Sequence, residues 1–206
     1  MDVRAKILEE ATRLFAAQGV DGTALQQIAD AVGVAKPSLL YHFPSKDALH
    51  RSVLEHLLSR WSEIVPRLLR AVAREDRFDA ILDATLEFFA ADPDRARLLL
   101  REALDRPVEM RELLTTHVAP WLGVIAESIK KAQADGAMRS DVDPEAYVLQ
   151  VIHLVIGTFT TGITLQALLG GNGHKRRAVV DRRLVDELKR IARLAVMTHV
   201  YGNGRK

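Results

Sequence analysis

Apolar residues recur along almost the whole chain at the spacing of an amphipathic helix, and no segment alternates convincingly as a strand. The first apolar stripe, from Val3 to Phe15, predicts a helix over residues 3–18, and Gly19 stands where a left-handed C-terminal cap belongs. Further apolar stripes at the same period follow to the end of the chain. The pattern therefore predicts an all-α fold.

Two short helices are expected directly after the first. Residues 24–32 form one of them, because Thr23 and Gln26 have the spacing of a capping box and Gly33 stops the helix. Residues 36–42 form the other. Two short helices joined through a glycine are the layout of a helix-turn-helix.

Beyond Phe43 the predicted helices are longer. Ser45 is expected to cap a helix that bends at Pro66, and Pro120 is expected to kink a later helix. The expected ranges are 46–72, 78–91, 93–104, 107–134, 144–169 and 179–201. We expect two domains, a three-helix unit over residues 1–48 and a larger helical unit over residues 49–206.

Composition narrows the class of protein. The 206 residues are 48% hydrophobic and 27% charged, which is typical of a soluble globular chain. The absence of cysteine excludes disulfides and cysteine-ligated zinc, and the N-terminus lacks the uninterrupted apolar region of a secretory signal. We therefore expect a cytoplasmic protein.

Charge is distributed unevenly along the chain. Residues 1–50 carry five Lys and Arg against six Asp and Glu, whereas residues 174–206 carry ten against three. Bulk charge alone would place nucleic-acid binding at the C-terminus, around Lys175, Arg176 and Arg177. We interpret that surplus as a solvated face, because the motif that indicates DNA binding lies in the slightly acidic N-terminal part.

The segment from Thr23 to Lys46 carries the most specific pattern in the sequence. Small Ala29 lets two helices approach closely, and Gly33 accommodates a left-handed turn between them. The pattern consists of Thr23, Ile28-Ala29, Gly33-Val34, Leu39, Tyr41-His42-Phe43 and Ser45-Lys46. In these residues the chain resembles the DNA-binding domain of the tetracycline-repressor (TetR) family. Ala35 departs from that family's usual capping serine, which removes a hydrogen bond worth about 1 kcal/mol.

The resemblance implies that residues 36–42 enter the major groove of operator DNA as a recognition helix. Lys36 and Ser38 are then expected to reach base edges, with Gln26 or Gln27 beside them. Phosphate contacts are expected from Thr23, Tyr41, His42 and Lys46, although Tyr41 and His42 have a structural alternative and Phe43 belongs to the core. The predicted DNA-binding set is Thr23, Gln26, Gln27, Lys36, Pro37, Ser38, Tyr41, His42 and Lys46.

The C-terminal helices are expected to form a homodimer. Residues 146–173 contain no Asp, Glu, Lys or Arg, but their threonines, glutamines and His153 make the segment too polar for a comfortable membrane span. Apolar residues also follow one face of the last helix, from Leu184 to Ala195. The resemblance implies that the last two helices of each subunit pair in a four-helix bundle over residues 145–201.

The resemblance also implies that the middle helices, residues 54–134, enclose a cavity for a small-molecule effector. Aromatic and apolar candidates suggest a largely apolar ligand. The candidate walls and polar points are Trp61, Thr85, Phe88, Phe89, Met110, Thr115, Thr116, His117, Trp121 and His153. A ligand that tilts the helix over residues 46–72 would change the spacing of the two recognition helices and release a repressor from its operator.

An enzyme and a helical interaction protein without DNA binding are the alternative classes. The sequence has no glycine-rich phosphate loop after a strand, no His-Glu-x-x-His and no nucleophile elbow. His50 and His56 are six residues apart, so they do not share a helix face as an i, i+4 metal pair would. We therefore predict no catalytic residue, no metal site and no cofactor.

Overall fold

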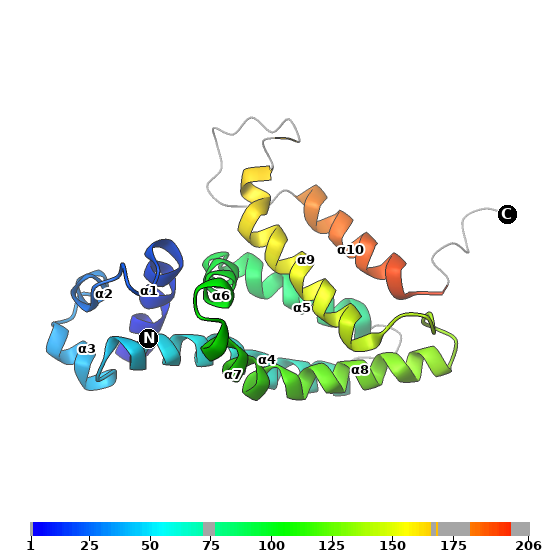
Figure 1. The fold of residues 1–206 in the computed structure, drawn as a ribbon, viewed down its shortest axis with the longest axis horizontal. Helices are drawn as coiled ribbons and strands as arrows, with labels where there is room; N and C mark the ends of the chain where they lie inside the picture. The colour runs from blue at the N-terminus through cyan, green and yellow to red at the C-terminus, as the bar shows by residue number, and fades with distance from the viewer. Residues whose placement is uncertain (1, 72–76, 166–167, 169–181, 199–206) are drawn as a thin grey trace.

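The computed structural model describes residues 2–71, 77–165, 168 and 182–198, and for residues 61–71 and 163 it describes the backbone alone. The described residues form helices α1 to α10, arranged as a small unit at one end and a larger helical body at the other (Figure 1). The predicted all-α fold is confirmed.

The small unit consists of α1 (Val3–Gln18), α2 (Leu25–Val32) and α3 (Lys36–His42). These bounds agree with the prediction to within one residue, because local signals fix both ends of each helix. The Asp2 carboxylate accepts a hydrogen bond from the Arg4 amide at 3.4 Å at the start of α1. Gly19 ends α1 with a φ of +77°, a left-handed value that side chains rarely adopt.

Helix α4 (Lys46–Ala71) connects the small unit to the rest of the molecule. The Ser45 hydroxyl accepts a hydrogen bond from the Ala48 amide at 3.0 Å, as expected of a cap. Leu49 and Val53 of α4 are fully buried in one core with residues of α1. The predicted boundary at residue 48 therefore falls inside one continuous helix.

Four further helices follow along the chain, namely α5 (Arg77–Ala91), α6 (Asp94–Asp105), α7 (Pro107–His117) and α8 (Ala119–Ala134). The expectation of a single kinked helix over residues 107–134 is wrong, because the chain breaks at Val118 into α7 and α8. Pro120 explains the break, since proline has no N–H to donate to a preceding turn and fits best at the start of a helix.

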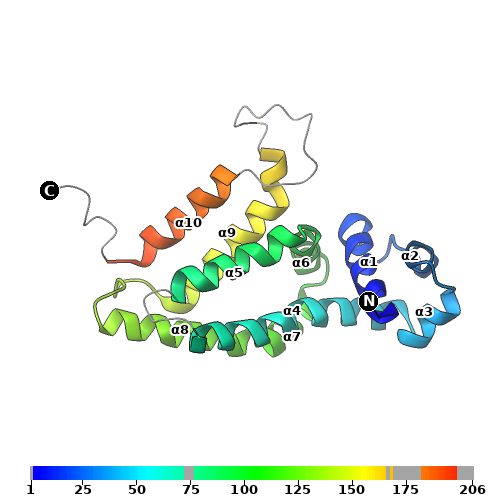
Figure 2. The same ribbon diagram turned by 180° about the vertical axis from the view of Figure 1, so that it is seen from behind.

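Helices α9 (Pro144–Leu165) and α10 (Arg182–Val196) complete the body. Helix α9 packs against α5, α6 and α8, and α10 lies on its outer side (Figures 1 and 2). Lys189 of α10 pairs with Asp83 of α5 at 2.6 Å, which fixes α10 on the body. None of the described helices combines the length and apolar character that a membrane crossing requires. The predicted ends at residues 169 and 201, and the basic cluster at 175–177, lie outside the described residues.

Candidate DNA-binding surface and effector cavity

The turn between α2 and α3 fixes the direction of α3. Gly33 adopts a left-handed conformation with φ +78° and ψ +33°, and the next amide, that of Val34, donates to the Ala29 carbonyl at 2.9 Å. Ile28 and Ala29 of α2 and Leu39 of α3 are fully buried. The inner faces of both helices are therefore committed to the core, and the opposite face of α3 is left to solvent.

That outer face of α3 is polar and exposed. Lys36, Pro37 and Ser38 are exposed in its first turn, and Tyr41 is 87% exposed. The Tyr41 ring stands edge-on to the half-buried His42 ring with 5.4 Å between centroids. Tyr41 is thus a surface residue, whereas Phe43 is in the core as expected. Exposed cationic, hydroxyl and aromatic groups on one short helix suit the edges and backbone of a DNA groove.

The two glutamines of α2 are also exposed, but each has an intramolecular partner. The Gln26 amide group donates to Asp30 at 2.7 Å, and the Gln27 side-chain oxygen accepts from the Ala24 amide at 2.8 Å. Ala24 is therefore the N-cap of α2, one residue later than the predicted capping box. Gln27 supplies the single side-chain bond of that cap, because the methyl group of Ala24 cannot accept one.

Thr23 does not reach the surface. It is fully buried, and its hydroxyl donates to the Gly19 carbonyl at 2.7 Å at the end of α1. The hydroxyl is therefore turned away from solvent in this structure, and a DNA contact by the Thr23 side chain stays a prediction. Its role is to hold the start of α2 against α1.

Lys46, for which the sequence predicts a phosphate contact, binds within the chain in this structure. Its ammonium group donates to the carbonyl oxygens of Val20, Asp21 and Thr23 at 3.0, 3.4 and 3.1 Å. An ammonium group has three donors, and these three carbonyls take them all. Lys46 therefore ties the first turn of α4 to the segment that joins α1 and α2.

Helix α6 is the main contact between the helix-turn-helix unit and the body, as the view from behind shows (Figure 2). Arg106, which follows α6, pairs with Asp21 at 3.0 Å. The guanidinium of Arg101 lies against Gly19, so near that a Cβ there would stand 3.0 Å from it. These contacts place α6 directly on the α1–α2 segment that Lys46 also holds.

A buried polar pair lies at the same junction. The Nε2 atom of His50 on α4 is 2.9 Å from Oε2 of Glu102 on α6, and the two side chains are 8% and 2% exposed. Neither atom has a hydrogen-bond partner of good geometry among the described residues, so the pair is held by proximity and charge complementarity. The Phe15 ring of α1 stands edge-on to the His50 imidazole at 5.7 Å. The pair therefore joins α4 to α6 beside α1.

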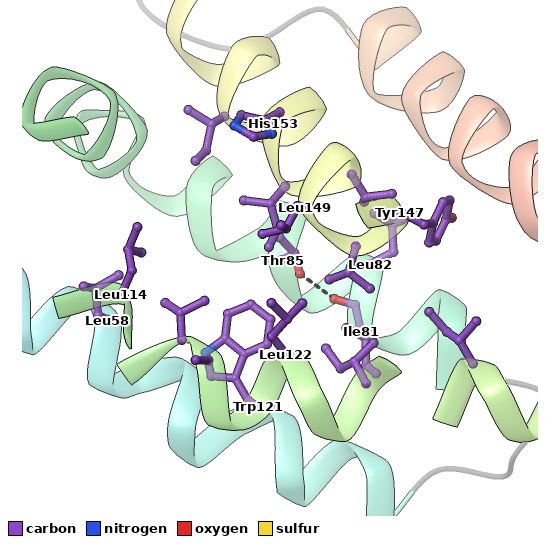
Figure 3. A pocket seen from close by; sticks show the side chains of 18 of the residues that line it. Leu58, Ile81, Leu82, Thr85, Leu114, Trp121, Leu122, Tyr147, Leu149 and His153 are labelled. Carbon is purple, nitrogen blue, oxygen red and sulfur yellow. Dashed lines mark hydrogen bonds between the residues drawn. The ribbon is translucent and has the colours of Figure 1, made fainter. Parts of the chain in front are cut away.

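The body holds a cavity of about 490 Å³ between α4, α5, α6, α7, α8 and α9. This volume lies within the range of about 300–1,000 Å³ that small-molecule sites occupy. Trp121 and Leu122 of α8 enter it from one side, and Leu149 and His153 of α9 face them (Figure 3). Most of the wall is aliphatic, in keeping with the largely apolar ligand that we expected.

Six of the predicted residues lie on the cavity wall, namely Thr85, Phe89, Met110, Thr115, Trp121 and His153. Phe88, Thr116 and His117 do not line this cavity. Phe88 packs instead under the Arg95 guanidinium, 4.5 Å from the ring centre, because neighbouring residues of a helix point in different directions. The side chain of Trp61 lies outside the described residues.

Aliphatic residues of α9 and Tyr147 belong to the part of the wall that the sequence did not indicate. Tyr147 lines the cavity, and its hydroxyl donates to the Ala192 carbonyl of α10 at 2.6 Å. Burial raises the pKa of this phenol, so it stays a neutral donor at physiological pH. Val148, Ile152 and Ile156 stood out in the sequence only as members of a long apolar run, which marks burial but not a cavity.

An exposed recognition helix, braced on a helical body that holds a separate cavity, defines a helix-turn-helix transcriptional regulator. Comparison with protein-family models supports the same class of protein. Residues 7–53 match the model described as bacterial regulatory proteins, tetR family, and residues 75–186 match the tetracyclin repressor-like C-terminal domain. The chain belongs to the TetR family, whose members are DNA-binding transcriptional regulators and not enzymes.

Individual relatives support the same assignment. The chain is 34% identical over 151 residues to the HTH-type transcriptional repressor KstR2 of Rhodococcus jostii, which covers 69% of this chain and 71% of that protein. The fold is similar to that of the fatty acid degradation regulator FadR from Bacillus halodurans, with a TM-score of 0.72, 16% identity and 95% coverage of both chains. It is also similar to AibR in complex with isovaleryl coenzyme A and operator DNA, with a TM-score of 0.69, 19% identity and coverage of 94% and 97%.

Proposed function

We propose that this regulator is a repressor that binds operator DNA through α3 and leaves it when a small molecule occupies the cavity. The observation that carries the proposal is that α4 contributes both to the helix-turn-helix core and to the cavity wall, through Leu49 and Leu58 respectively. The similar protein AibR was solved with an acyl coenzyme A and operator DNA together, which supports the same pairing of ligands here.

The exposed residues of α3 are the proposed DNA contacts. Lys36 and Ser38 in its first turn are placed to read base edges, and Tyr41 with His42 to hold the backbone. Gln26 and Gln27 could join them only by giving up their bonds to Asp30 and the Ala24 amide. Because each α3 spans only a short stretch of DNA, two subunits are needed for a specific site.

Helix α6 is the proposed route from cavity to DNA. Leu99 and Ala103 of α6 line the cavity, and Glu102, which lies beside them on the helix surface, contacts His50 of α4. A ligand that displaces Leu99 or Ala103 would therefore shift α6 where it contacts α4, and would reorient the helix-turn-helix unit. A coupling of about 1–3 kcal/mol between the two sites would give useful induction.

The proposed dimer uses the outward faces of α9 and α10. Leu154, Thr161 and Leu165 are exposed on α9 with half-buried Thr158 between them, and Ile191 is exposed on α10. The neighbouring face of α10 is already used, because Leu188 and Val196 are buried against the body. Exposed leucine and isoleucine on two neighbouring helices suit a bundle with a second copy of the chain.

Selection of the wild-type chain against random DNA tests this function. We expect an inverted repeat whose half-sites are separated by about one helical turn or more. Lys36→Ala should relax the selected sequence at one position of each half-site, whereas Lys130→Ala on the remote helix α8 should select the wild-type site. Recovery of no preferred sequence by the wild-type chain would refute the assignment of α3 as a reading helix.

A further inference from the structure

The charged groups on the cavity wall are all of one sign. Among the described residues that line it, Arg77 and Arg111 are cationic, and none is Asp or Glu. The rest of the wall is aliphatic and aromatic side chains with a few hydroxyls. A cavity built for an uncharged hydrocarbon needs no arginine, and repulsion by Arg77 and Arg111 disfavours a cationic ligand.

Arg111 of α7 is the cation best placed to meet a ligand. It lies on the wall and is exposed, and it forms no ion pair in the part of the chain that the structure describes. Other arginines of the body behave differently, since Arg97 pairs with Asp94 at 2.7 Å and Arg139 with Asp141 at 2.6 Å. Arg77 also has an interaction of its own. The Arg111 guanidinium therefore offers its donors at the edge of an apolar space.

The hydroxyl groups on the wall offer fewer donors than their number suggests. Thr85 donates to the Ile81 carbonyl at 2.7 Å (Figure 3), Thr115 to the Arg111 carbonyl at 2.8 Å, and Tyr147 to Ala192 as described above. These protons are committed within the chain, whereas the Arg111 guanidinium carries several donors and a full positive charge at the cavity wall. A guanidinium binds a carboxylate or phosphate through two parallel hydrogen bonds.

We propose that the effector is an amphiphilic anion, with an apolar chain in the cavity and a carboxylate or phosphate bound by Arg111 at its edge. The inference rests on the proposed function and specifies the ligand class. An anion deep among the aliphatic residues would lose its hydration without compensation, whereas at exposed Arg111 it keeps water on one side and gains a counter-charge on the other. The chain length that fits is set by the aliphatic wall.

Three ligands with the same eight-carbon chain test the proposal by calorimetric titration of the full chain at neutral pH. These are octanoate, octan-1-ol and octanoyl coenzyme A. We expect at least one of the two anions to bind about tenfold more tightly than the alcohol, the effect of one charge-assisted interaction at a partly open site. Tight binding of octanoate identifies a free acid as the source of the negative charge, and tight binding of the thioester alone identifies its phosphates.

Substitutions at Arg111 test whether this residue causes the preference for the anion. Arg111→Gln should remove the preference for the anion and leave the affinity for octan-1-ol unchanged, which also shows that the variant is folded. Arg111→Lys should retain part of the preference, and the matched control Arg97→Gln, outside the cavity wall, should retain all of it.

Equal binding of alcohol and anions, binding of none of them, or an anion preference that survives Arg111→Gln overturns the proposal. Operator binding in the absence of ligand does not involve the cavity edge. Such a result would therefore refute the ligand class alone, whereas failure of the wild-type chain to select DNA would refute the proposed function.

Discussion

Glu102 of α6 and His50 of α4 meet at the junction of the helix-turn-helix unit and the body, and Glu102→Leu separates them. The carboxylate is 2% exposed and its Oε2 atom lies 2.9 Å from His50 Nε2. Leucine leaves that imidazole nitrogen buried without a partner, which costs about 1–3 kcal/mol for a neutral donor. Breaking a buried charged pair costs about 3–5 kcal/mol. We therefore expect a loss of about 3 kcal/mol in the free energy of unfolding.

Urea denaturation followed by circular dichroism at one protein concentration measures this loss. Glu102→Gln keeps an oxygen that can accept from the imidazole, so it should lose only about 1 kcal/mol. The matched control Glu112→Leu, an exposed glutamate of α7, should stay within about 0.5 kcal/mol of the wild type. In a double-mutant cycle with His50→Leu, the two changes should be non-additive by at least about 1 kcal/mol. Additive effects, or a loss below 0.5 kcal/mol for Glu102→Leu, would refute the reasoning.

Three further predictions follow from single side chains. Lys46→Met removes the donor to three carbonyls and should lower the free energy of unfolding by about 1–2 kcal/mol, measured by urea denaturation, while Lys36→Met leaves it unchanged. Ile191→Glu places a charge on the exposed face of α10 and should convert the dimer to a monomer in analytical ultracentrifugation, and a wild-type monomer would contradict the interface. Burial and nearby arginines lower the pKa of His56 below its ordinary value of 6.5, so the unfolded chain binds this proton first. Stability should therefore be complete above about pH 6.5 and decline below it, and His56→Gln should reduce that slope in thermal melts at pH 5 to 7.

Helix positions and the helix-turn-helix were predictable because their signals are local. Gly19 and Gly33 both have a positive φ and end the helices that they were expected to end. The predicted ranges 3–18 and 36–42 agree with the structure. Ala35 was correctly identified as a cap without a side-chain bond. The prediction failed at Thr23, because the Thr23–Gln26 and Ala24–Gln27 pairs have the same spacing. Only packing against α1 decides between them.

The contacts that join distant segments could not be predicted. Glu102 and His50 lie far apart in the sequence, and nothing near either residue indicates a partner. Lys46 suggested a phosphate contact from its motif, but the carbonyls it binds come from a turn that forms only when α1 packs on α4. Only some of the residues that line the cavity could be predicted, for a similar reason. Aromatic side chains indicate a core, and the direction of each helix then decides that Phe89 lines the cavity while Phe88 does not.

The ratio of affinities for a selected operator and a scrambled duplex tests the central claim most directly. Fluorescence anisotropy at physiological salt should give a ratio of about 10³ or more for the wild-type chain, with two protomers or a multiple of two on each site. Lys36→Glu on α3 should reduce that ratio sharply, and Lys130→Glu on α8 should not. Equal affinity for the two duplexes, or a ratio that is indifferent to the charge of Lys36, would contradict the claim that α3 reads operator DNA.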